Sequence, residues 1–409
     1  MSAVHPVPSG TGHEDTPAAP RFARRALTGF FVSGLLFSFP GAILPVWQAQ
    51  LTQDFTEVGK YFFAMGLGLV AGLRMASGWS PWRSVRFWLT AGSSLGLAAF
   101  VLLAFASPPA PALWRLAGLF LAGMGASLLN NGLFEAVGPL YQRDRAATLN
   151  LAGAMFGLGC FITALMVSQT FYLLRGPGVP LLLAAGPALG LWLFHRTDYP
   201  SMPFSAPARR QTLRDLQTPI TILLSLLMFF QFASEWSIAG WLPLFLIRRL
   251  GASPQAAILM LACFWLVLFS GRIIAQSTLD RLHHGRLLGL SVLVELFGYF
   301  LLSQTDNLSG ATVGVVCLGA GYSVTYPLVA EKIGHRFSDA HPFRLRGIFW
   351  LAMSGALLAP WLLGYFAEAW GIGSVLALPF LGTLASCFLL LLILLEAYLS
   401  GLRRGTREA

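Results

Sequence analysis

The sequence predicts an all-α integral membrane protein with twelve membrane-spanning helices in two groups of six. Three observations predict this fold class: the composition, the lengths of the apolar runs and the positions of the basic residues. Of the 409 residues, 56% are hydrophobic and 11% are charged, whereas soluble domains carry about 25% charged residues. The mean hydropathy is +0.68. One water-soluble core cannot hide so much apolar surface.

The apolar runs set the number of spans. A helix that crosses a bilayer needs about 20 mostly apolar residues, and twelve runs come close to this length or exceed it. Proline and glycine inside them predict kinks rather than breaks, because neighbouring helices can satisfy the freed backbone groups. The predicted spans are 26–49, 55–78, 85–106, 112–138, 146–170, 178–195, 217–247, 253–277, 286–305, 309–332, 345–368 and 373–400.

The basic residues support this count and orient the chain. With twelve spans and a cytoplasmic N terminus, 22 of the 27 lysines and arginines fall on the cytoplasmic side. Basic residues gather on that side of membrane proteins, so the split predicts that both termini are cytoplasmic in a bacterial inner membrane. The five basic residues on the other side are Lys60, Arg115, Arg175, Arg248 and Arg249.

The chain divides into two halves. Pro45 and Arg74 of the first half match Pro243 and Arg272 of the second half at one offset of 198 residues, as in transporters built from two parallel repeats. The N-terminal stretch has no apolar core of a signal peptide and is rich in polar residues, prolines and glycines. The predicted organisation is a disordered cytoplasmic tail (1–20), a six-helix bundle (21–195), a cytoplasmic linker (196–216), a second six-helix bundle (217–400) and a cytoplasmic tail (401–409).

Several classes of function are excluded. The net charge of +10 is scattered in small groups rather than gathered in a patch, so nucleic acid is not an expected partner. Neither Lys60 nor Lys332 lies in a P-loop, and no HExxH motif occurs. The G-x-S-x-G string at 92–96 lies inside an apolar span, where small residues pack helices. The four cysteines have no metal or redox spacing. We therefore expect no enzyme, no cofactor and no metal site.

Carboxylates inside apolar runs are the most informative residues. An ionised group at the bilayer centre costs about 2.5–3.5 kcal/mol, so it usually faces a cavity or a partner. Burial favours the neutral form of a carboxyl group, which suits a residue that binds and releases protons. Glu235 is the first choice for proton coupling and Glu135 the second. The alternatives are interhelical hydrogen bonding for Glu235 and pairing with a nearby arginine for Glu135. Glu295 is a third candidate, with no polar neighbours along its own span.

Glu235 has neighbours suited to a polar ring. Gln231 lies one turn earlier on the same helix face, and Trp236 and Trp241 follow. Aromatic faces beside an amide and a carboxylate suit a sugar-like solute, although tryptophan is also common at membrane interfaces and amides also join helices. The predicted substrate-binding residues are Gln48, Asn130, Asn131, Asn150, Gln231, Trp236, Trp241 and Tyr326.

A second charged group is expected at the cytoplasmic ends of the spans. Ion pairs between the two halves there would hold the cytoplasmic side shut in an outward-facing state. The alternative is that these residues only set the orientation of the chain. The predicted gate consists of Arg74, Asp144, Arg145, Arg272, Asp280, Arg281 and Arg286.

Together these features resemble the major facilitator superfamily. Twelve spans, two halves, a basic central loop and charged loops after spans 2 and 8 are typical of it. Residues 276–286 (QSTLDRLHHGR) are similar to its Asp-Arg loop motif, with a longer spacing, and the first-half counterpart at 72–84 (GLRMASGWSPWRS) lacks the aspartate. The resemblance implies transport by alternating access between two bundles.

Two short stretches also resemble the fucose–proton symporter-like group. They are Gly138-Pro139 followed by Leu149–Ala152, and residues 234–242 (SEWSIAGWL). The chain differs from this group at specific positions. Gly153 and Phe156 stand where members of the group have two amide residues that contact sugar, and Ser127 stands where they have a carboxylate. Their aspartate in span 1 has no counterpart here. The pocket therefore suits a solute other than fucose.

These observations predict a secondary transporter that moves a small neutral polar, sugar-like solute with a proton. Its expected partners are the solute, protons and the lipid bilayer, and we expect it to act as a monomer. Two alternatives stay open. The 13% aromatic content also suits proton-driven efflux of amphipathic compounds, and a transport-inactive receptor or scaffold would share the fold.

Overall fold

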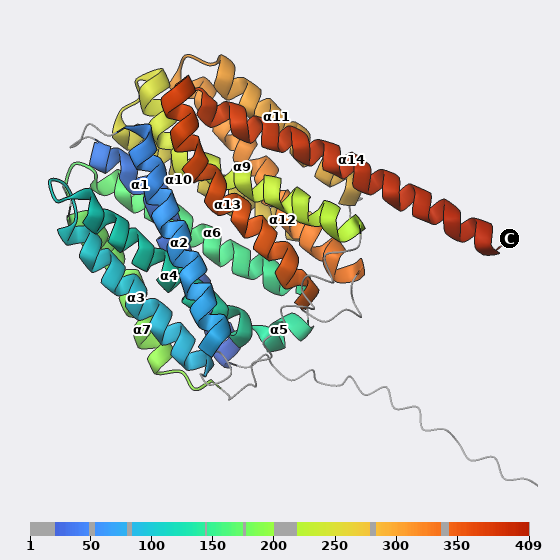
Figure 1. Ribbon diagram of the computed structural model, residues 1–409, viewed down its shortest axis with the longest axis horizontal. Helices are drawn as coiled ribbons and strands as arrows, with labels where there is room; N and C mark the ends of the chain where they lie inside the picture. Colours follow the sequence, from blue (N-terminus) through green and yellow to red (C-terminus); the bar gives the residue numbers. More distant parts are fainter. Residues whose placement is uncertain are drawn as a thin grey trace, which may run out of the picture.

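In the computed structural model the chain is a bundle of long helices (Figure 1). The structure describes residues 21–48, 54–79, 84–143, 145–174, 177–199, 219–278, 284–336 and 343–408, which contain helices and no strand. The elements are α1 (Arg21–Gln48), α2 (Phe55–Trp79), α3 (Val85–Phe105), α4 (Ala112–Ala136), α5 (Gly138–Arg143), α6 (Arg145–Thr170), α7 (Gly178–His195), α9 (Pro219–Leu250), α10 (Pro254–Thr278), α11 (His284–Gln304), α12 (Leu308–Arg336), α13 (Phe343–Trp370) and α14 (Ser374–Glu408).

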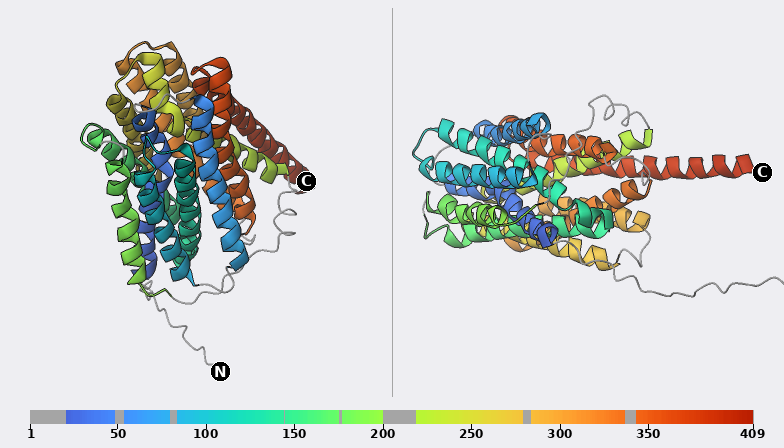
Figure 2. Two further views of the ribbon diagram at one scale, coloured as in Figure 1. Left: turned by 60° about the vertical axis from the view of Figure 1, so that its left-hand side comes forward. Right: turned by 90° about the horizontal axis from the view of Figure 1, so that it is seen from below.

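Each predicted span corresponds to one long helix, so the predicted fold class is confirmed. Within the described residues, eleven helices are long and apolar enough to cross a membrane; α2, the twelfth long helix, carries Glu57, Lys60 and Arg74. The largest difference is at α14, which continues to Glu408 rather than ending near residue 400. At about 1.5 Å per residue, 35 residues exceed the thickness of a bilayer, and the end of α14 extends beyond the bundle (Figures 1 and 2).

Glycine ends two of the central helices. Gly251 directly follows α9 and Gly371 directly follows α13, with φ angles of 64° and 83°. Side chains other than glycine rarely adopt this left-handed conformation, which terminates a helix by turning the chain away from its axis. Both glycines lie at the same end of the bundle, because α9 and α13 run in the same direction.

The alternation of helix directions gives the bundle two faces. We call the face where α1 begins and α14 ends the terminal face, and the face where α1 ends and α2 begins the distal face. The first half (α1–α7) packs on the second half (α9–α14) mainly through α6 on α10, α2 on α13 and α1 on α9. The predicted tail 1–20 and most of the predicted linker lie outside the described residues.

The two halves are packed tightly near the distal face. A Cβ atom at Gly59 of α2 would lie 2.7 Å from the carbonyl oxygen of Trp361 and 3.2 Å from the Cα of Gly364 of α13. The Phe55 amide donates to Glu368 Oε2 at 2.9 Å. Gly41 of α1 is in similarly close contact with the Ala239 backbone of α9. Glycine therefore allows the helix backbones to meet and close this face.

Toward the terminal face the contacts change. Figure 1 shows α2 and α13 lying close near the distal face and diverging toward the terminal face. The contacts between the halves differ from one helix pair to another. In the described part of the chain, α4 of the first half and α12 of the second half do not pack closely, whereas α6 and α10 are in close contact. Near the terminal ends of α6 and α10 the halves still meet, at Gly153 and Arg272, and much of the predicted gate lies outside the described residues. Among the described residues the distal face is closed.

The buried Arg115 belongs to this distal packing. Its Nε donates to the Tyr61 hydroxyl at 2.9 Å and its Nη1 to the Ala110 carbonyl at 2.7 Å. The guanidinium carbon also lies 5.8 Å from the centre of the Trp47 ring, within the range of a cation–π contact. Arg115 thus joins α1, α2 and α4 and is part of the scaffold of the first half.

We predict that Gly59→Val loosens the distal closure, because its side chain would overlap the α13 backbone. The measurement is the rate at which a maleimide labels Ala367→Cys, in a background without the four native cysteines. Ala367 lies one turn after Gly364 and is 1% exposed, so labelling should be slow in the parent and severalfold faster with Gly59→Val.

The control is Gly289→Val on α11, where a Cβ would meet no atom within 4 Å. Equal labelling rates in the parent and in both valine variants would contradict the closure described here.

Candidate substrate and proton site

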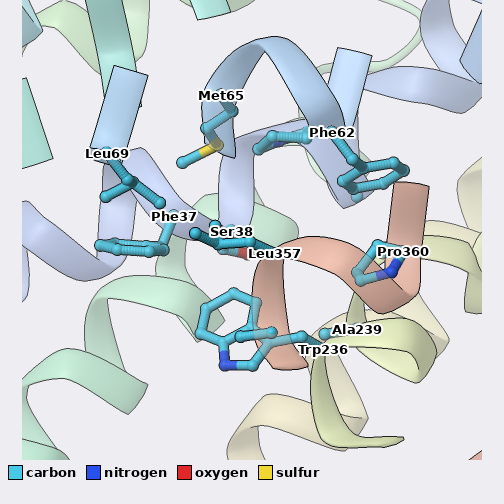
Figure 3. A pocket seen from close by; sticks show the side chains of 13 residues that line it. Phe37, Ser38, Phe62, Met65, Leu69, Trp236, Ala239, Leu357 and Pro360 are labelled. Atoms are coloured by element: carbon cyan, nitrogen blue, oxygen red, sulfur yellow. The ribbon is translucent and has the colours of Figure 1, made fainter. Parts of the chain in front are cut away.

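A small cavity lies between the two halves near the middle of the bundle (Figure 3). It encloses about 40 Å³ of free space, and one water molecule needs about 10–15 Å³. In this conformation it therefore has room for a few waters and is too small for a sugar. Ser38 and Trp236 supply the polar side-chain atoms of its lining. The side chains drawn around it include Phe37, Ser38, Phe62, Met65, Leu69, Trp236, Leu357 and Pro360, from α1, α2, α9 and α13.

Trp236 forms one wall of the cavity and is held by other aromatic rings. Its ring centre lies 5.4 Å from that of Phe37, 6.0 Å from Phe156 and 5.7 Å from Trp265. Within the described residues its indole Nε1 has no hydrogen-bond partner. A buried donor without a partner is unfavourable, and a water or a polar group of a solute beside the ring would satisfy it.

Glu235, the residue directly before Trp236, belongs to a buried ion pair with Arg272. Glu235 of α9 is 2% exposed and Arg272 of α10 is 5% exposed. Their Oε1 and Nη2 atoms are 3.5 Å apart. Each charge offsets the cost of burying the other, and removing one partner would leave an uncompensated charge inside the protein.

Arg272 is also attached to the first half of the molecule. Its Nη1 donates to the Gly153 carbonyl at 3.2 Å, and Asn150 Nδ2 donates to the Arg272 carbonyl at 3.1 Å. A Cβ at Gly153 would lie 3.3 Å from Nη1, so the glycine makes room for the guanidinium. The Tyr326 ring of α12 lies 5.8 Å from Cζ. The ion pair is therefore at a junction between the two halves.

The junction is not fully hydrogen-bonded. Among the described residues, Glu235 Oε2, Arg272 Nε and both amide atoms of Gln231 are buried without a hydrogen-bond partner. Native interiors leave few such atoms. These four atoms lie on α9 and α10 beside the aromatic wall. They form a set of donors and acceptors that water, a proton or a polar solute would satisfy.

Of the residues predicted for the substrate and proton site, Glu235, Asn150 and Tyr326 contact Arg272, and Trp236 lines the cavity. Gln231 lies near Glu295 instead. Asn150 has the role of an interhelical contact, which was one of the alternatives for the intramembrane amides. Arg272 differs from its predicted role in a gate at the helix ends. It is buried, because Glu235 of the neighbouring helix neutralises it.

Other predicted site residues lie elsewhere. Trp241 is fully buried and its Nε1 donates to the Pro360 carbonyl at 2.9 Å, so it joins α9 to α13. Gln48 is the last residue of α1, at the distal face, and Glu135 is partly exposed in the last turn of α4. Asn130 and Asn131 are also on α4 and do not line the cavity.

The predicted gate residues are not seen as a set. Arg74 and Arg286 are exposed near helix ends at the terminal face. Asp144, Asp280 and Arg281 lie outside the described residues, and so does the side chain of Arg145. The sequence offset that pairs Arg74 with Arg272 places both near the ends of corresponding helices, α2 and α10. Their surroundings nevertheless differ, since Arg74 is exposed whereas Arg272 is buried beside Glu235.

In the folded structure Glu295 is surrounded by polar side chains that come from other helices. It is 0% exposed, and its Oε1 accepts from Thr325 Oγ1 of α12 at 3.4 Å. Gln231, Thr383 and Glu235 are also close enough to influence it. These residues come from α9, α12 and α14, so only the packing of the helices reveals the cluster. In the part of the chain that the structure describes, no group of three His, Cys, Asp or Glu residues is arranged to hold a metal.

Among the described residues, twelve long helices form two halves with a cavity between them, an arrangement typical of membrane transporters. The model of the Major Facilitator Superfamily matches residues 26–354, so the chain belongs to this superfamily. It is a multi-pass integral membrane protein, and the family and fold are those of transporters rather than enzymes.

Two curated relatives match most of the chain. The membrane protein MosC of Rhizobium meliloti is 22% identical over 363 residues, which cover 88% of this chain and 87% of MosC. An uncharacterized MFS-type transporter of Yersinia pestis is 22% identical over 340 residues, covering 83% of this chain and 87% of the relative. Both relatives are bacterial, and neither name states a substrate.

Solved structures share the fold. The outward conformation of FucP, the Escherichia coli fucose:proton symporter, superimposes with a TM-score of 0.62 at 16% identity, covering 91% of this chain and 98% of FucP. A D-xylose-proton symporter has a TM-score of 0.66 at 16% identity, with 90% and 97% coverage. These likenesses confirm the predicted fold and the resemblance to the superfamily.

We predict that the Glu235–Arg272 pair contributes to stability as a unit. Removing one partner of a buried pair costs about 3–5 kcal/mol, so Glu235→Gln and Arg272→Gln should each destabilise the protein. The double variant should lose less than the sum of the two, by a coupling of about 0.5–3 kcal/mol. The measurement is the free energy of unfolding in mixed detergent micelles. Strictly additive losses would show that the two side chains do not interact.

Proposed function

We propose that this protein is a proton-coupled secondary transporter that moves a small neutral polar, sugar-like solute by alternating access. The observation that carries the proposal is the buried Glu235–Arg272 pair, 3.5 Å apart, at the contact between the halves. An intramembrane ion pair beside a cavity is a typical place for proton coupling.

The coupling follows from the charges. An ionised Glu235 holds Arg272 next to α6, where Arg272 also donates to the Gly153 carbonyl. Protonation of Glu235 removes its negative charge and with it most of the attraction to Arg272. This contact belongs to the observed, distally closed conformation. A proton therefore weakens that conformation relative to the distally open one, and an equilibrium shifts by such a difference in interaction.

The solute class follows from the groups at the cavity. Trp236 offers a flat aromatic surface and an indole N–H without a partner in the described residues, and Ser38 adds a hydroxyl group to the lining. Stacking combined with neutral hydrogen bonds suits a sugar or polyol. The similarity to two sugar–proton symporters supports this choice at the level of the fold. The Glu235–Arg272 pair already places two charges near the cavity, so a neutral solute is favoured over a charged one.

The sidedness follows from the basic residues. Their excess at the terminal face assigns that face to the cytoplasm, and the bacterial relatives favour a bacterial inner membrane. The observed conformation is then closed toward the outside. Protons from the outside would favour its opening there, and the solute would enter with the proton. We propose that one chain is sufficient for this cycle.

A second candidate is efflux of amphipathic compounds. The observation that favours it is the cavity lining, where Ser38 and Trp236 alone provide polar side-chain atoms. Such a surface binds weakly polar molecules well, because burial of apolar area drives their binding. Competition of transport by lipophilic cations, rather than by sugars and polyols, would favour this function. A transport-inactive receptor would show neither.

We predict that Glu235→Gln abolishes solute accumulation driven by a pH gradient and leaves solute exchange intact. Glutamine keeps the shape and polarity of the site but cannot exchange a proton. The measurement is uptake of labelled sugars and polyols by proteoliposomes, with and without an imposed pH gradient. Glu235→Asp, which retains a carboxyl group, is the matched control and should keep part of the accumulation. Full pH-driven accumulation by Glu235→Gln would show that the proton is carried elsewhere.

We also predict that Trp236→Phe weakens solute binding severalfold, because a hydrogen bond contributes about 0.5–1.5 kcal/mol and tenfold in affinity corresponds to about 1.4 kcal/mol. The matched control is Trp241→Phe, whose N–H already donates to Pro360. It should lower the thermal stability and leave the affinity nearly unchanged. The measurement is the concentration for half-maximal exchange in proteoliposomes, and an equal effect of both variants on it would exclude the role of Trp236.

A further inference from the structure

A second buried carboxyl group, Glu295, lies within the second half at a distance from the cavity lining. It is on α11 and 0% exposed, and Thr325 Oγ1 lies 3.4 Å from its Oε1. A Cβ at Gly321 of α12 would collide with Glu295 Cγ. A glycine at that position therefore leaves the space that the carboxyl side chain occupies.

The groups around Glu295 are neutral, apart from one carboxylate. From α9 they are Gln231 and Glu235, and from α14 Thr383. Ser291 Oγ and Thr325 Oγ1 are 3.3 Å apart, and the hydroxyls of Tyr299 and Tyr322 are 2.5 Å apart. The two tyrosines also lie near Glu295 and Thr383. Within the described residues, no cation forms an ion pair with Glu295.

The charges of this region do not balance if every group is ionised. Glu235 and Glu295 would contribute two negative charges, and Arg272 contributes one positive charge. The guanidinium is already next to Glu235. An unpaired buried carboxylate is strongly unfavourable, and such groups normally take up a proton instead.

The hydrogen bonds lead to the same conclusion. Glu295 Oε2 is buried without a hydrogen-bond partner at normal distance among the described residues, and Gln231 and Thr383 are its polar neighbours. A carboxylate only accepts hydrogen bonds, whereas a protonated carboxyl group also donates one. A proton on Glu295 would provide an O–H for one of these neighbouring acceptors.

We propose that Glu295 is a second proton-binding site, which holds a proton while Glu235 is paired with Arg272. Two carboxyl groups and one guanidinium then carry no net charge. Because the two carboxylates repel each other, ionisation of one favours protonation of the other. This inference rests on the proposed coupling role of Glu235 only for its consequence in transport; the resident proton itself follows from the packing.

The test is infrared spectroscopy of the purified, full-length protein in lipid at neutral pH, in H₂O and in D₂O. A protonated carboxyl group gives a carbonyl stretching band that is separate from that of carboxylates and shifts in D₂O. We expect this band in the wild type and in Glu235→Asp, which keeps the negative charge beside Arg272, and we expect its loss in Glu295→Gln. Asp306→Asn, at an exposed site, is the control and should leave the band unchanged.

Retention of the band in Glu295→Gln would overturn the proposal, because the proton would then reside on another carboxyl group. Absence of the band in the wild type would also overturn it. Glutamine resembles a protonated glutamate in shape, so Glu295→Gln should fold, and a melting curve of each variant checks this. The band reports on Glu295 even if Glu235 has no role in transport, so the two proposals fail separately.

Discussion

A buried guanidinium requires an anion beside it, and this requirement organises the centre of the molecule. Arg272 lies in the interior only because Glu235 is next to it, and Glu235 has access to no other cation among the described residues. The buried pair in turn requires space and hydrogen-bond partners from the neighbouring helix α6. Gly153 leaves room for the guanidinium, and Asn150 binds the backbone that carries it. The ion pair lies within the second half, and Arg272 also connects it to Gly153 and Asn150 of the first half.

The same conformation is supported at its other end by contacts of a different kind. Near the distal face the halves meet through glycine backbones and aromatic rings, including Gly59, Gly364 and Trp241. The glycine and aromatic contacts carry no charge, although Glu368 accepts a hydrogen bond from the Phe55 amide at the same face. The proton-sensitive contact and the steric contact are thus separated along the bundle. A change of charge at the centre alters the balance between them, which is the requirement for linking a proton to alternating access.

The sequence was sufficient to predict the fold, since each span is an apolar run of the right length and the basic residues mark its ends. It also indicated Glu235, Gln231 and Trp236, because a carboxylate, an amide and an aromatic ring share one short stretch. It did not indicate the partner of Glu235. The position of Arg272 near a helix end predicts a gate residue, and only the packing of α9 on α10 places Arg272 beside Glu235. Glu295 could not be interpreted from its own span, since Thr325 and Thr383 come from other helices.

The most direct measurement is the distance across the distal face as a function of pH. Spin labels at Lys60→Cys and Trp370→Cys, both exposed positions near the distal ends of α2 and α13, would report it in a background without native cysteines. The account predicts a short distance at neutral pH that lengthens on acidification, and a distance in Glu235→Gln that does not depend on pH. A wild-type distance independent of pH, or the same pH dependence in Glu235→Gln, would contradict the claim that protonation of Glu235 controls the closure.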